Sequence, residues 1–322
     1  YMVPSFLVYL AQLPLTPNGK LDRKALPAPD ASKSQQAYVA PQSELEQRIA
    51  AIWQDVLGLE RIGLNDNFFE LGGDSIISIQ VVSRARQAGI RFTPKELFQH
   101  QTVQALAAVA QQGEAGAGID QGPVTGELAL LPIHQAFFDT AVPARQHWNQ
   151  SVLLKPAQAL DGALLEQALQ ALTVQHDALR LRFAHNNGQW QAHFAATAGE
   201  NLLWQERTDD VEALANRAQR SLDLSNGPLL RGVLAQLENG EQRLLLVVHH
   251  LAVDGVSWRI LFEDLQTAYS QLSRGEAVQL PAKTSSIKHW AEQLQAHARS
   301  GALDAELAYW QAQLRDAPVD LP

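Results

Sequence analysis

Apolar residues recur at helical spacing in several segments in the first third of the chain. Ser43 and Glu46 form a capping-box pattern, and the apolar residues that follow them are three or four positions apart. Similar patterns begin at Ser75, Thr93 and Thr102, and Thr93 is followed by a proline, which suits the first position of a helix. We therefore expect a small bundle of roughly three or four short helices around one core.

The C-terminal part of the chain mixes helical and strand patterns. Residues 162–183 are predicted to form one helix, whose apolar stripe contains Leu165 and Leu172. The run RLLLVVHHLAV, residues 243–253, is continuously apolar up to its two histidines, which is typical of a strand buried on both faces. Residues 256–272 then return to helical spacing. A strand, a polar turn and a helix in this order predict an α/β fold with functional groups in the turn.

Two compositional breaks divide the chain. Residues 28–40 are rich in Pro, Ala, Ser and Gln, residues 113–127 are rich in glycine, and both segments are predicted to be linkers. We therefore expect a multidomain chain with a short N-terminal tail (1–27), a compact helical unit (41–112) and an α/β unit (128–322).

Composition narrows the range of functions. The chain has 322 residues, of which 46% are hydrophobic, and a formal net charge of −9, which argues against a nucleic-acid partner. It has no cysteine, so disulfides and thiolate metal sites are not available. We find no apolar run approaching the roughly 20 residues that span a bilayer. We expect a cytoplasmic protein, no membrane partner and a chain that is a piece of a longer protein.

The segment FFELGGDSIISIQ, residues 68–80, places Ser75 after two glycines and an aspartate, at the start of a helical pattern. In one interpretation Ser75 is an ordinary N-cap, whose hydroxyl accepts a hydrogen bond from the backbone. In the other, Gly72 and Gly73 leave room for a large group at the hydroxyl, and the free N–H groups of the helix end favour a phosphate there. Neither the G-x-S-x-G pattern of hydrolases nor the P-loop pattern is present.

The string DNFFELGGDSI, residues 66–76, resembles the attachment motif of peptidyl carrier (thiolation) domains of nonribosomal peptide synthetases. The resemblance covers residues 41–112 and implies a four-helix-bundle carrier. It also implies that Ser75 carries 4'-phosphopantetheine, with Asp74 and Gly73 flanking the attachment site. A phosphopantetheinyl transferase is then an expected partner, and an aminoacyl or peptidyl thioester is the expected cargo.

The N-terminal string LPLTPNGKLDRKALP, residues 13–27, contains Lys20 within a turn pattern. Composition alone is typical of a solvated turn lysine. The string also resembles the closing motif of adenylation domains, in which the lysine at this position contacts the acyl-adenylate. The resemblance implies that residues 1–27 are the end of an upstream adenylation domain, with no adenylation activity of their own.

Two adjacent histidines, His249 and His250, end the buried strand pattern. Neighbouring side chains of a strand point to opposite faces, so at most one of them can face a given cavity. A histidine after an apolar strand is commonly a hydrogen-bonded structural residue, and it can also be a catalyst. We expect no metal site, because Asp254 alone does not complete a set of ligands.

The longer string HHLAVDGVSWRIL, residues 249–261, resembles the H-H-x-x-x-D-G motif of the condensation superfamily, whose two-lobed fold is shared with chloramphenicol acetyltransferase. The resemblance implies that His250 works at the reaction centre, that Asp254 fixes the loop and that Gly255 gives the backbone room. The string HDALRLRF resembles a second motif of this family. There Arg180 has two interpretations, a structural ion pair with Asp254 or an exposed helix charge.

Two enzymes share this scaffold. The strings DGVSWRIL and HWNQSVLL, together with Asp74 in the carrier motif, resemble the epimerisation subtype, in which an aminoacyl centre is inverted from L to D. Inversion removes the Cα proton and returns one from the opposite face, and an imidazole, with a pKa of about 6.5, suits that task. Two alternatives remain, a condensation domain that forms peptide bonds and a carrier beside an inert lobe. A downstream condensation domain is an implied partner.

The resemblance also predicts that this chain alone is inactive. Residues 128–322 correspond to less than half of a complete epimerisation domain, and the family's second catalytic group, a glutamate, lies in the other lobe. We expect the loaded chain, incubated by itself in D2O, to incorporate little or no deuterium at Cα, as followed by mass spectrometry. Rapid exchange would show that the N-terminal lobe is sufficient for proton abstraction.

Overall fold

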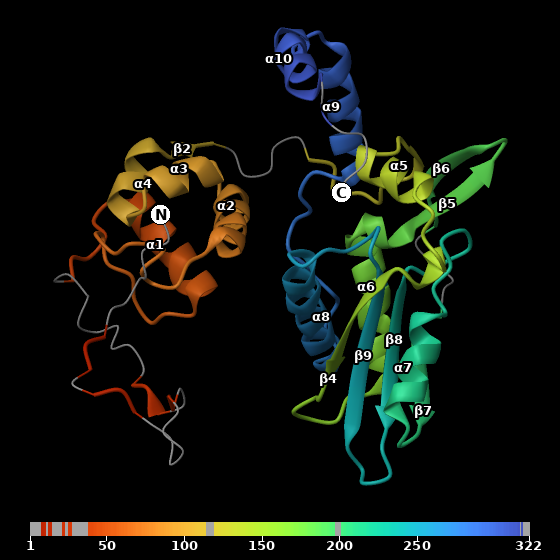
Figure 1. Cartoon of the computed structure of the whole chain (residues 1–322). Coiled ribbons are helices and arrows are strands. Elements are labelled where there is room, and N and C mark those ends of the chain that lie inside the picture. Colours follow the sequence, from red (N-terminus) through yellow and green to blue (C-terminus); the bar gives the residue numbers. More distant parts are fainter. Residues whose placement is uncertain are drawn as a thin grey trace. The chain divides into compact units, whose positions relative to one another are not determined.

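The computed structural model describes residues 8–10, 12–14, 21–22, 25–27, 38–113, 119–196, 201–315 and 317. The chain divides into two compact units, Tyr1–Gly118 and Ile119–Pro322, and each is described here by itself (Figure 1). Lys20 lies outside the described residues, as does most of the expected linker 28–40. Within the described ranges, no helix has the length and apolar character that crossing a membrane requires.

The first unit is a helical bundle, as the sequence predicts. Its helices are α1 (Glu44–Leu57), α2 (Ser75–Gln87), α3 (Pro94–Gln99) and α4 (Val103–Val109). Two short strands, β1 (Ile90–Arg91) and β2 (Gln111–Gln112), pair in antiparallel fashion near the end of the unit. The core is formed by apolar side chains from all four helices and the long α1–α2 loop, including Trp53, Phe68, Val81, Leu97 and Leu106.

The predicted helix ends of this unit are confirmed. The Ser43 hydroxyl accepts from the Glu46 N–H at 3.2 Å, and the Glu46 carboxylate accepts from the Ser43 N–H at 2.8 Å, which completes a capping box. Thr93 and Glu96 repeat this arrangement at α3. Helix α1 ends at Gly58, whose φ of +66° lies in the left-handed region that favours glycine.

The second unit contains two sheets. The larger one has the strand order β4 (Asn149–Leu154), β9 (Gln242–His249), β8 (Leu230–Gln236) and β7 (Leu203–Arg207), in which only the β7–β8 pair is parallel. The smaller one is antiparallel, with the order β3 (Gly126–Leu128), β6 (Gln189–Phe194) and β5 (Leu181–Asn186). Besides the helices that cover the larger sheet, the second unit contains α5 (Pro132–Asp139), η3 (Arg145–His147), η4 (Asp177–Arg180), α9 (Ile287–Arg299) and α10 (Asp304–Leu314).

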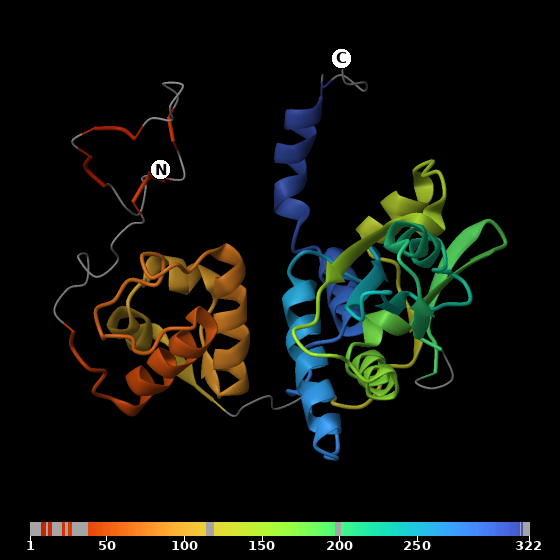
Figure 2. The same cartoon turned by 90° about the horizontal axis from the view of Figure 1, so that it is seen from below.

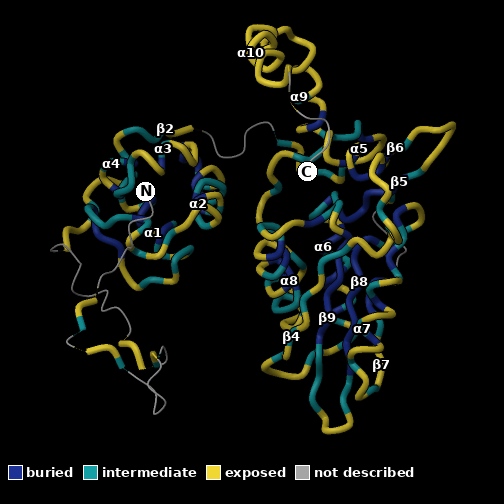
Figure 3. The backbone as a smooth tube through the Cα atoms, viewed as in Figure 1, coloured by how far each residue is buried: buried dark blue, intermediate teal, exposed yellow. Residues whose placement is uncertain are grey.

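Helices cover both faces of the larger sheet. On one face, α6 (Gly162–Gln175) and α8 (Ser257–Ser273) lie side by side and contribute leucines to a core with β8 and β9 (Figure 2). On the other face, α7 (Val211–Gln219) packs on the same two strands. The strands β8 and β9 are therefore almost entirely buried, whereas α10 has no buried residue (Figure 3). The continuous apolar run of β9 is explained by this coverage on both sides, as predicted.

One predicted helix is too long. Helix α6 ends at Gln175, and the residues that follow form η4 and then strand β5, rather than a helix that extends to Phe183. Residues 181–183 of LRLRF belong to strand β5, which pairs with β6, whereas residues 179 and 180 belong to η4. Strand β6 follows β5 after a tight turn, and its sequence shows no helical spacing. The helical spacing of the leucines in residues 162–183 is therefore not sufficient to predict where the helix ends.

Two buried histidines stabilise the region around α5. His134 accepts from the Leu131 N–H through Nδ1 and packs edge-on against Phe183. His249, fully buried, donates through Nε2 to the Arg145 carbonyl at 2.8 Å and accepts from the Leu251 N–H through Nδ1. Burial lowers the pKa of His249 below its usual value; the Arg145 carbonyl opposes this, and the neighbouring His250 adds to it. Both ring nitrogens of the neutral imidazole are thus satisfied, and a further proton has no acceptor.

We predict that the second unit loses stability as the pH falls below about 6.5, the ordinary histidine pKa. Because the pKa of His249 is lowered on folding, the unfolded chain takes up its proton first. The contribution is complete above pH 6.5 and declines as the pH falls toward the lowered pKa. Denaturant unfolding at pH 7.5 and pH 5.5 checks this. The difference should shrink in His249→Gln and persist in the exposed control His289→Asn; equal differences in all three proteins would contradict the prediction.

Candidate functional site

Ser75 is the first residue of α2, and its neighbour Asp74 is the N-cap of that helix. The Asp74 carboxylate accepts from the N–H groups of Ile76 and Ile77 at 2.8 and 2.7 Å. Ser75 is exposed, and the capping function that one interpretation gave to its hydroxyl belongs to Asp74. The expectation of free N–H groups for a phosphate is also wrong, because Asp74 occupies two of them.

Glycine is favoured at each of the two positions before Asp74 for a different structural reason. Gly72 has φ +101°, a conformation that side chains rarely adopt, and a Cβ there would meet no atom within 4 Å. A Cβ on Gly73 would lie 2.4 Å from the Phe68 ring, so that residue must be glycine for the loop to pack on the core. Gly73 therefore shapes the loop that presents Ser75.

The site fits a long prosthetic group attached at Ser75. The hydroxyl is exposed at the end of a helix, and two residues on the outer face of that helix, Ile76 and Ile79, are 38% and 47% exposed. The inner face of α2 is formed instead by Ser78, Val81 and Ala85. A phosphopantetheine on Ser75 would leave both the helix cap and the core unchanged.

The adjacent histidines His249 and His250, at the end of β9, lie in different environments. His249, at the end of β9, is buried against Phe137 at a ring distance of 6.0 Å. His250 is exposed, its N–H donates to the Trp148 carbonyl at 2.8 Å, and its ring stacks on the Trp148 indole at 6.4 Å. Only His250 can therefore meet a substrate.

The His250 ring is held in one tautomer. Its Nδ1 lies 2.8 Å from the Val253 carbonyl, which can only accept, so Nδ1 carries the proton. The Nε2 atom is left with a lone pair, and His250 as a residue is exposed. An imidazole in this state is a general base without further rearrangement.

Asp254 fixes the loop that follows His250. Its Oδ1 accepts from the Ser257 N–H and hydroxyl at 2.8 and 2.6 Å, which ties the loop to the first residue of α8. Partial burial acts to raise the pKa of Asp254, but the hydrogen bonds from Ser257 and from the Val256 N–H outweigh it, and the pKa is lowered. A Cβ at Gly255 would meet nothing within 4 Å, so packing does not require the room that this glycine was expected to give.

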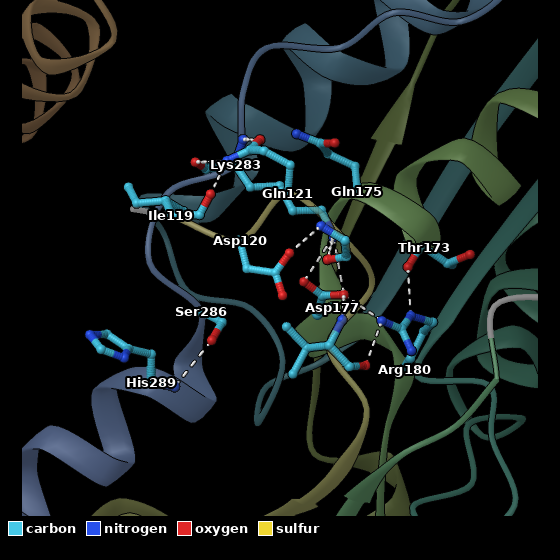
Figure 4. A network of polar contacts seen from close by, with 12 residues as sticks. Ile119, Asp120, Gln121, Thr173, Gln175, Asp177, Arg180, Lys283, Ser286 and His289 are labelled. Carbon is cyan, nitrogen blue, oxygen red and sulfur yellow. Dashed lines mark hydrogen bonds and ion pairs between the residues drawn. The ribbon is translucent and has the colours of Figure 1, made fainter. Parts of the chain in front are cut away.

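Arg180 is buried, which rules out an exposed helix charge, and its ion pair is with Asp177 rather than with Asp254 (Figure 4). The same Asp177 carboxylate lies 3.0 Å from the Lys283 Nζ. The other guanidinium N–H groups donate to backbone carbonyls from separate segments. Removing one partner of a buried ion pair lowers the free energy of unfolding by about 3–5 kcal/mol. The contacts of Arg180 therefore indicate a structural residue.

The Arg180 network also orders part of the expected linker 113–127. The Val124 N–H donates to Asp177 at 3.0 Å, and Gln121 exchanges hydrogen bonds with the backbone of Lys283 (Figure 4). Residues 119–127 therefore belong to the second unit, whereas residues 114–118 lie outside the described residues.

Sequence reasoning did not identify two side chains beside His250. The Trp258 Nε1–H donates to the Gln150 Oε1 at 2.8 Å, and the Gln150 Nε2 lies 3.5 Å from the His250 Nε2. Both residues occur in the strings that resemble the epimerisation subtype, HWNQSVLL and DGVSWRIL. The contact of Gln150 with His250, and that of Trp258 with Gln150, could not be read from those strings, because both depend on tertiary structure. In the described ranges, no group of three or more His, Cys, Asp or Glu residues is arranged to hold a metal ion.

Comparison with known protein families gives two matches. The family described as "Condensation domain" matches residues 124–322, and "Phosphopantetheine attachment site" matches residues 47–110. Among curated proteins, a linear gramicidin synthase from Brevibacillus parabrevis is 51% identical over all of this chain, which covers 6% of that protein. Tyrocidine synthase 2, also from Brevibacillus parabrevis, is 44% identical over 96% of the chain, or 9% of its own length.

Among solved structures, the epimerization domain from the third module of tyrocidine synthetase B is similar, with a TM-score of 0.58 and 37% sequence identity. The match covers 63% of this chain and 48% of that domain. A condensation domain of the calcium-dependent antibiotic synthetase, 24% identical with a TM-score of 0.50, shows the same fold. The chain thus spans about half of the condensation-type domains that it matches.

We predict that the cap of α2 depends on Asp74. Asp74→Ala should destabilise the start of the helix by about 1 kcal/mol, whereas Asp74→Asn, which keeps a capping oxygen, should cost much less. Hydrogen–deuterium exchange of the α2 amides checks this, with roughly fivefold faster exchange expected in the alanine variant. Equal acceleration in both variants would show that the negative charge, and not the cap, stabilises the helix.

Proposed function

This chain belongs to the condensation domain family and carries the phosphopantetheine attachment domain of a nonribosomal peptide synthetase; from this premise we propose that it presents an aminoacyl or peptidyl group for inversion from L to D at Cα. In this proposal the helical carrier supplies the residue that holds the acyl group, and the α/β lobe of chloramphenicol-acetyltransferase type supplies the base. Ser75 is the proposed attachment residue in the first, and His250 is the proposed base in the second.

Phosphopantetheine, when attached, supplies a thiol that holds the acyl group as a thioester, which makes the Cα proton more acidic. The Ser75 hydroxyl is exposed and is not the N-cap of α2, so the group can be attached without loss of the cap. The carrier proposed over residues 41–112 thereby delivers the acyl group to the lobe proposed over residues 128–322.

The observation that carries the proposal is the state of His250. Its Nδ1 proton is held by the Val253 carbonyl, its Nε2 keeps a lone pair, and the residue is exposed. In the proposed reaction the Cα–H bond breaks, the proton moves to Nε2, and the electron pair enters the carbonyl system. A second acid returns a proton to Cα from the opposite face, His250 then gives its proton to solvent, and solvent reprotonates the acid, so the net change is the configuration alone. Asp254 has no part in the proton transfer; its hydrogen bonds to Ser257 hold the loop that follows His250.

Peptide-bond formation is the second candidate, because the matching family is described as "Condensation domain". The same Nε2 would then accept a proton from an attacking amine. Epimerisation is favoured by the likeness to the tyrocidine epimerization domain at 37% identity, above the 24% identity of the condensation domain compared. The expected partners are a phosphopantetheinyl transferase, an upstream adenylation domain and a downstream condensation domain.

Chiral analysis tests the proposal in the natural polypeptide that contains this chain. Treatment with coenzyme A and a transferase should add the mass of phosphopantetheine to the wild type and not to Ser75→Ala. After loading with an L-aminoacyl group, hydrolysis should release a mixture of L and D forms. In His250→Ala the inversion should slow by roughly a hundred- to ten-thousandfold, whereas His289→Asn should match the wild type.

A purely L product together with peptide formation would favour the condensation alternative. Equal mass gain in Ser75→Ala would show that another residue is modified. Unchanged inversion in His250→Ala would remove His250 from the reaction.

A further inference from the structure

Gln150 reaches the candidate base from a different strand. In the β4–β9 ladder, Asn149 is opposite His249 and Gln150 is opposite Val248. Side chains of paired residues lie on the same face of a sheet, so the Gln150 side chain shares a face with that of Val248, and His250 follows directly after the end of β9. The end of its amide lies 3.5 Å from the His250 Nε2.

The orientation of the Gln150 amide follows from its partner on α8. The Trp258 indole N–H can only donate, and it lies 2.8 Å from the Gln150 Oε1. The amide oxygen is therefore turned toward Trp258, and the NH2 group is turned toward His250. Trp258 is 8% exposed and packed in the core, so the group that sets this orientation is itself fixed.

A donor and an acceptor thus stand side by side at the Nε2 end of the His250 ring. The Nε2 atom of His250 accepts a proton, and the Gln150 NH2 donates a hydrogen bond. Their separation of 3.5 Å is long for a hydrogen bond between them, so each keeps its capacity for a third group. A carbon acid has the matching pair of sites, because a carbonyl oxygen lies about 2.4 Å from the neighbouring Cα.

We propose that Gln150 is a catalytic residue whose side-chain amide donates to the acyl carbonyl oxygen while His250 removes the Cα proton. The inference rests on the proposed function. As the C–H bond breaks, its electron pair moves toward the carbonyl oxygen, and the amide N–H stabilises the negative charge that develops there. The proton goes to Nε2, and reprotonation at Cα restores the carbonyl, so Gln150 itself gains and loses nothing.

Trp258 acts through Gln150 and is a positioning residue. Without its N–H, the amide can turn by 180° and present its oxygen to the substrate, which would repel the developing charge. The loss caused by Trp258→Phe should therefore disappear when Gln150 is already replaced, because the two residues act as one unit. A structural role for Trp258 would give losses that multiply.

Isotope exchange at Cα, measured on the loaded natural polypeptide in D2O, tests the proposal. Gln150→Leu keeps the shape of the side chain and removes the donor, so exchange should slow by roughly a hundred- to a thousandfold. The matched control is Gln167→Leu on the exposed side of α6, which should exchange at the wild-type rate. Trp258→Phe should lose less than Gln150→Leu, and the double variant should equal Gln150→Leu. Exchange in Gln150→Leu at the wild-type rate would overturn the proposal.

A second measurement does not depend on turnover. When the acyl carbonyl is labelled with 13C, its infrared stretch should lie at lower frequency in the wild-type polypeptide than in Gln150→Leu, because a hydrogen bond weakens the C=O bond. Equal frequencies in the two proteins would overturn the contact. This outcome is separable from failure of the proposed function: a wild type that makes peptide bonds without exchange refutes epimerisation, and the infrared shift still decides whether Gln150 contacts the carbonyl.

Discussion

The antiparallel pairing of β4 with β9 is the constraint on which the candidate active site depends. It fixes which side chains share a face at the end of the sheet, and it does so through backbone hydrogen bonds alone. The ladder ends at His249, which is buried in the core, and the next residue, His250, is exposed. A shift of β4 by one residue would turn Gln150 to the opposite face and bring Asn149 to the side of His250.

Backbone carbonyls give the two neighbouring histidines opposite tautomers. His249 donates through Nε2 to Arg145, and His250 donates through Nδ1 to Val253. The first arrangement satisfies both ring nitrogens, as in a structural residue; the second leaves one nitrogen open, as the proposed role of His250 as a base requires. Two identical side chains thus acquire different chemistry from the position of one oxygen atom each.

Local signals in the sequence were sufficient for the helix ends and for the buried strand, because capping boxes and apolar runs act over a few residues. The capping box of Ser43 and the coverage of β9 were predicted correctly for this reason. Signals that depend on distant partners were not readable. Strand β5 lies in a segment predicted to be helical, neither interpretation of Arg180 included its partner Asp177, and the bond between Trp258 and Gln150 joins residues 108 positions apart. The motifs placed Ser75 and His250 at the two candidate sites, but the orientation of each group follows from tertiary contacts.

The division of labour between Asp74 and Ser75 has a consequence for the working cycle of the carrier. Because the Asp74 carboxylate accepts from the Ile76 and Ile77 N–H groups, the proposed attachment of a group at Ser75 leaves both of these hydrogen bonds in place. The unmodified carrier, the carrier loaded with an acyl group and the unloaded carrier should then have the same free energy of unfolding. The free energy of each loading step is in that case available for the chemical reaction and for docking, because none of it is used to change the fold of the helical unit.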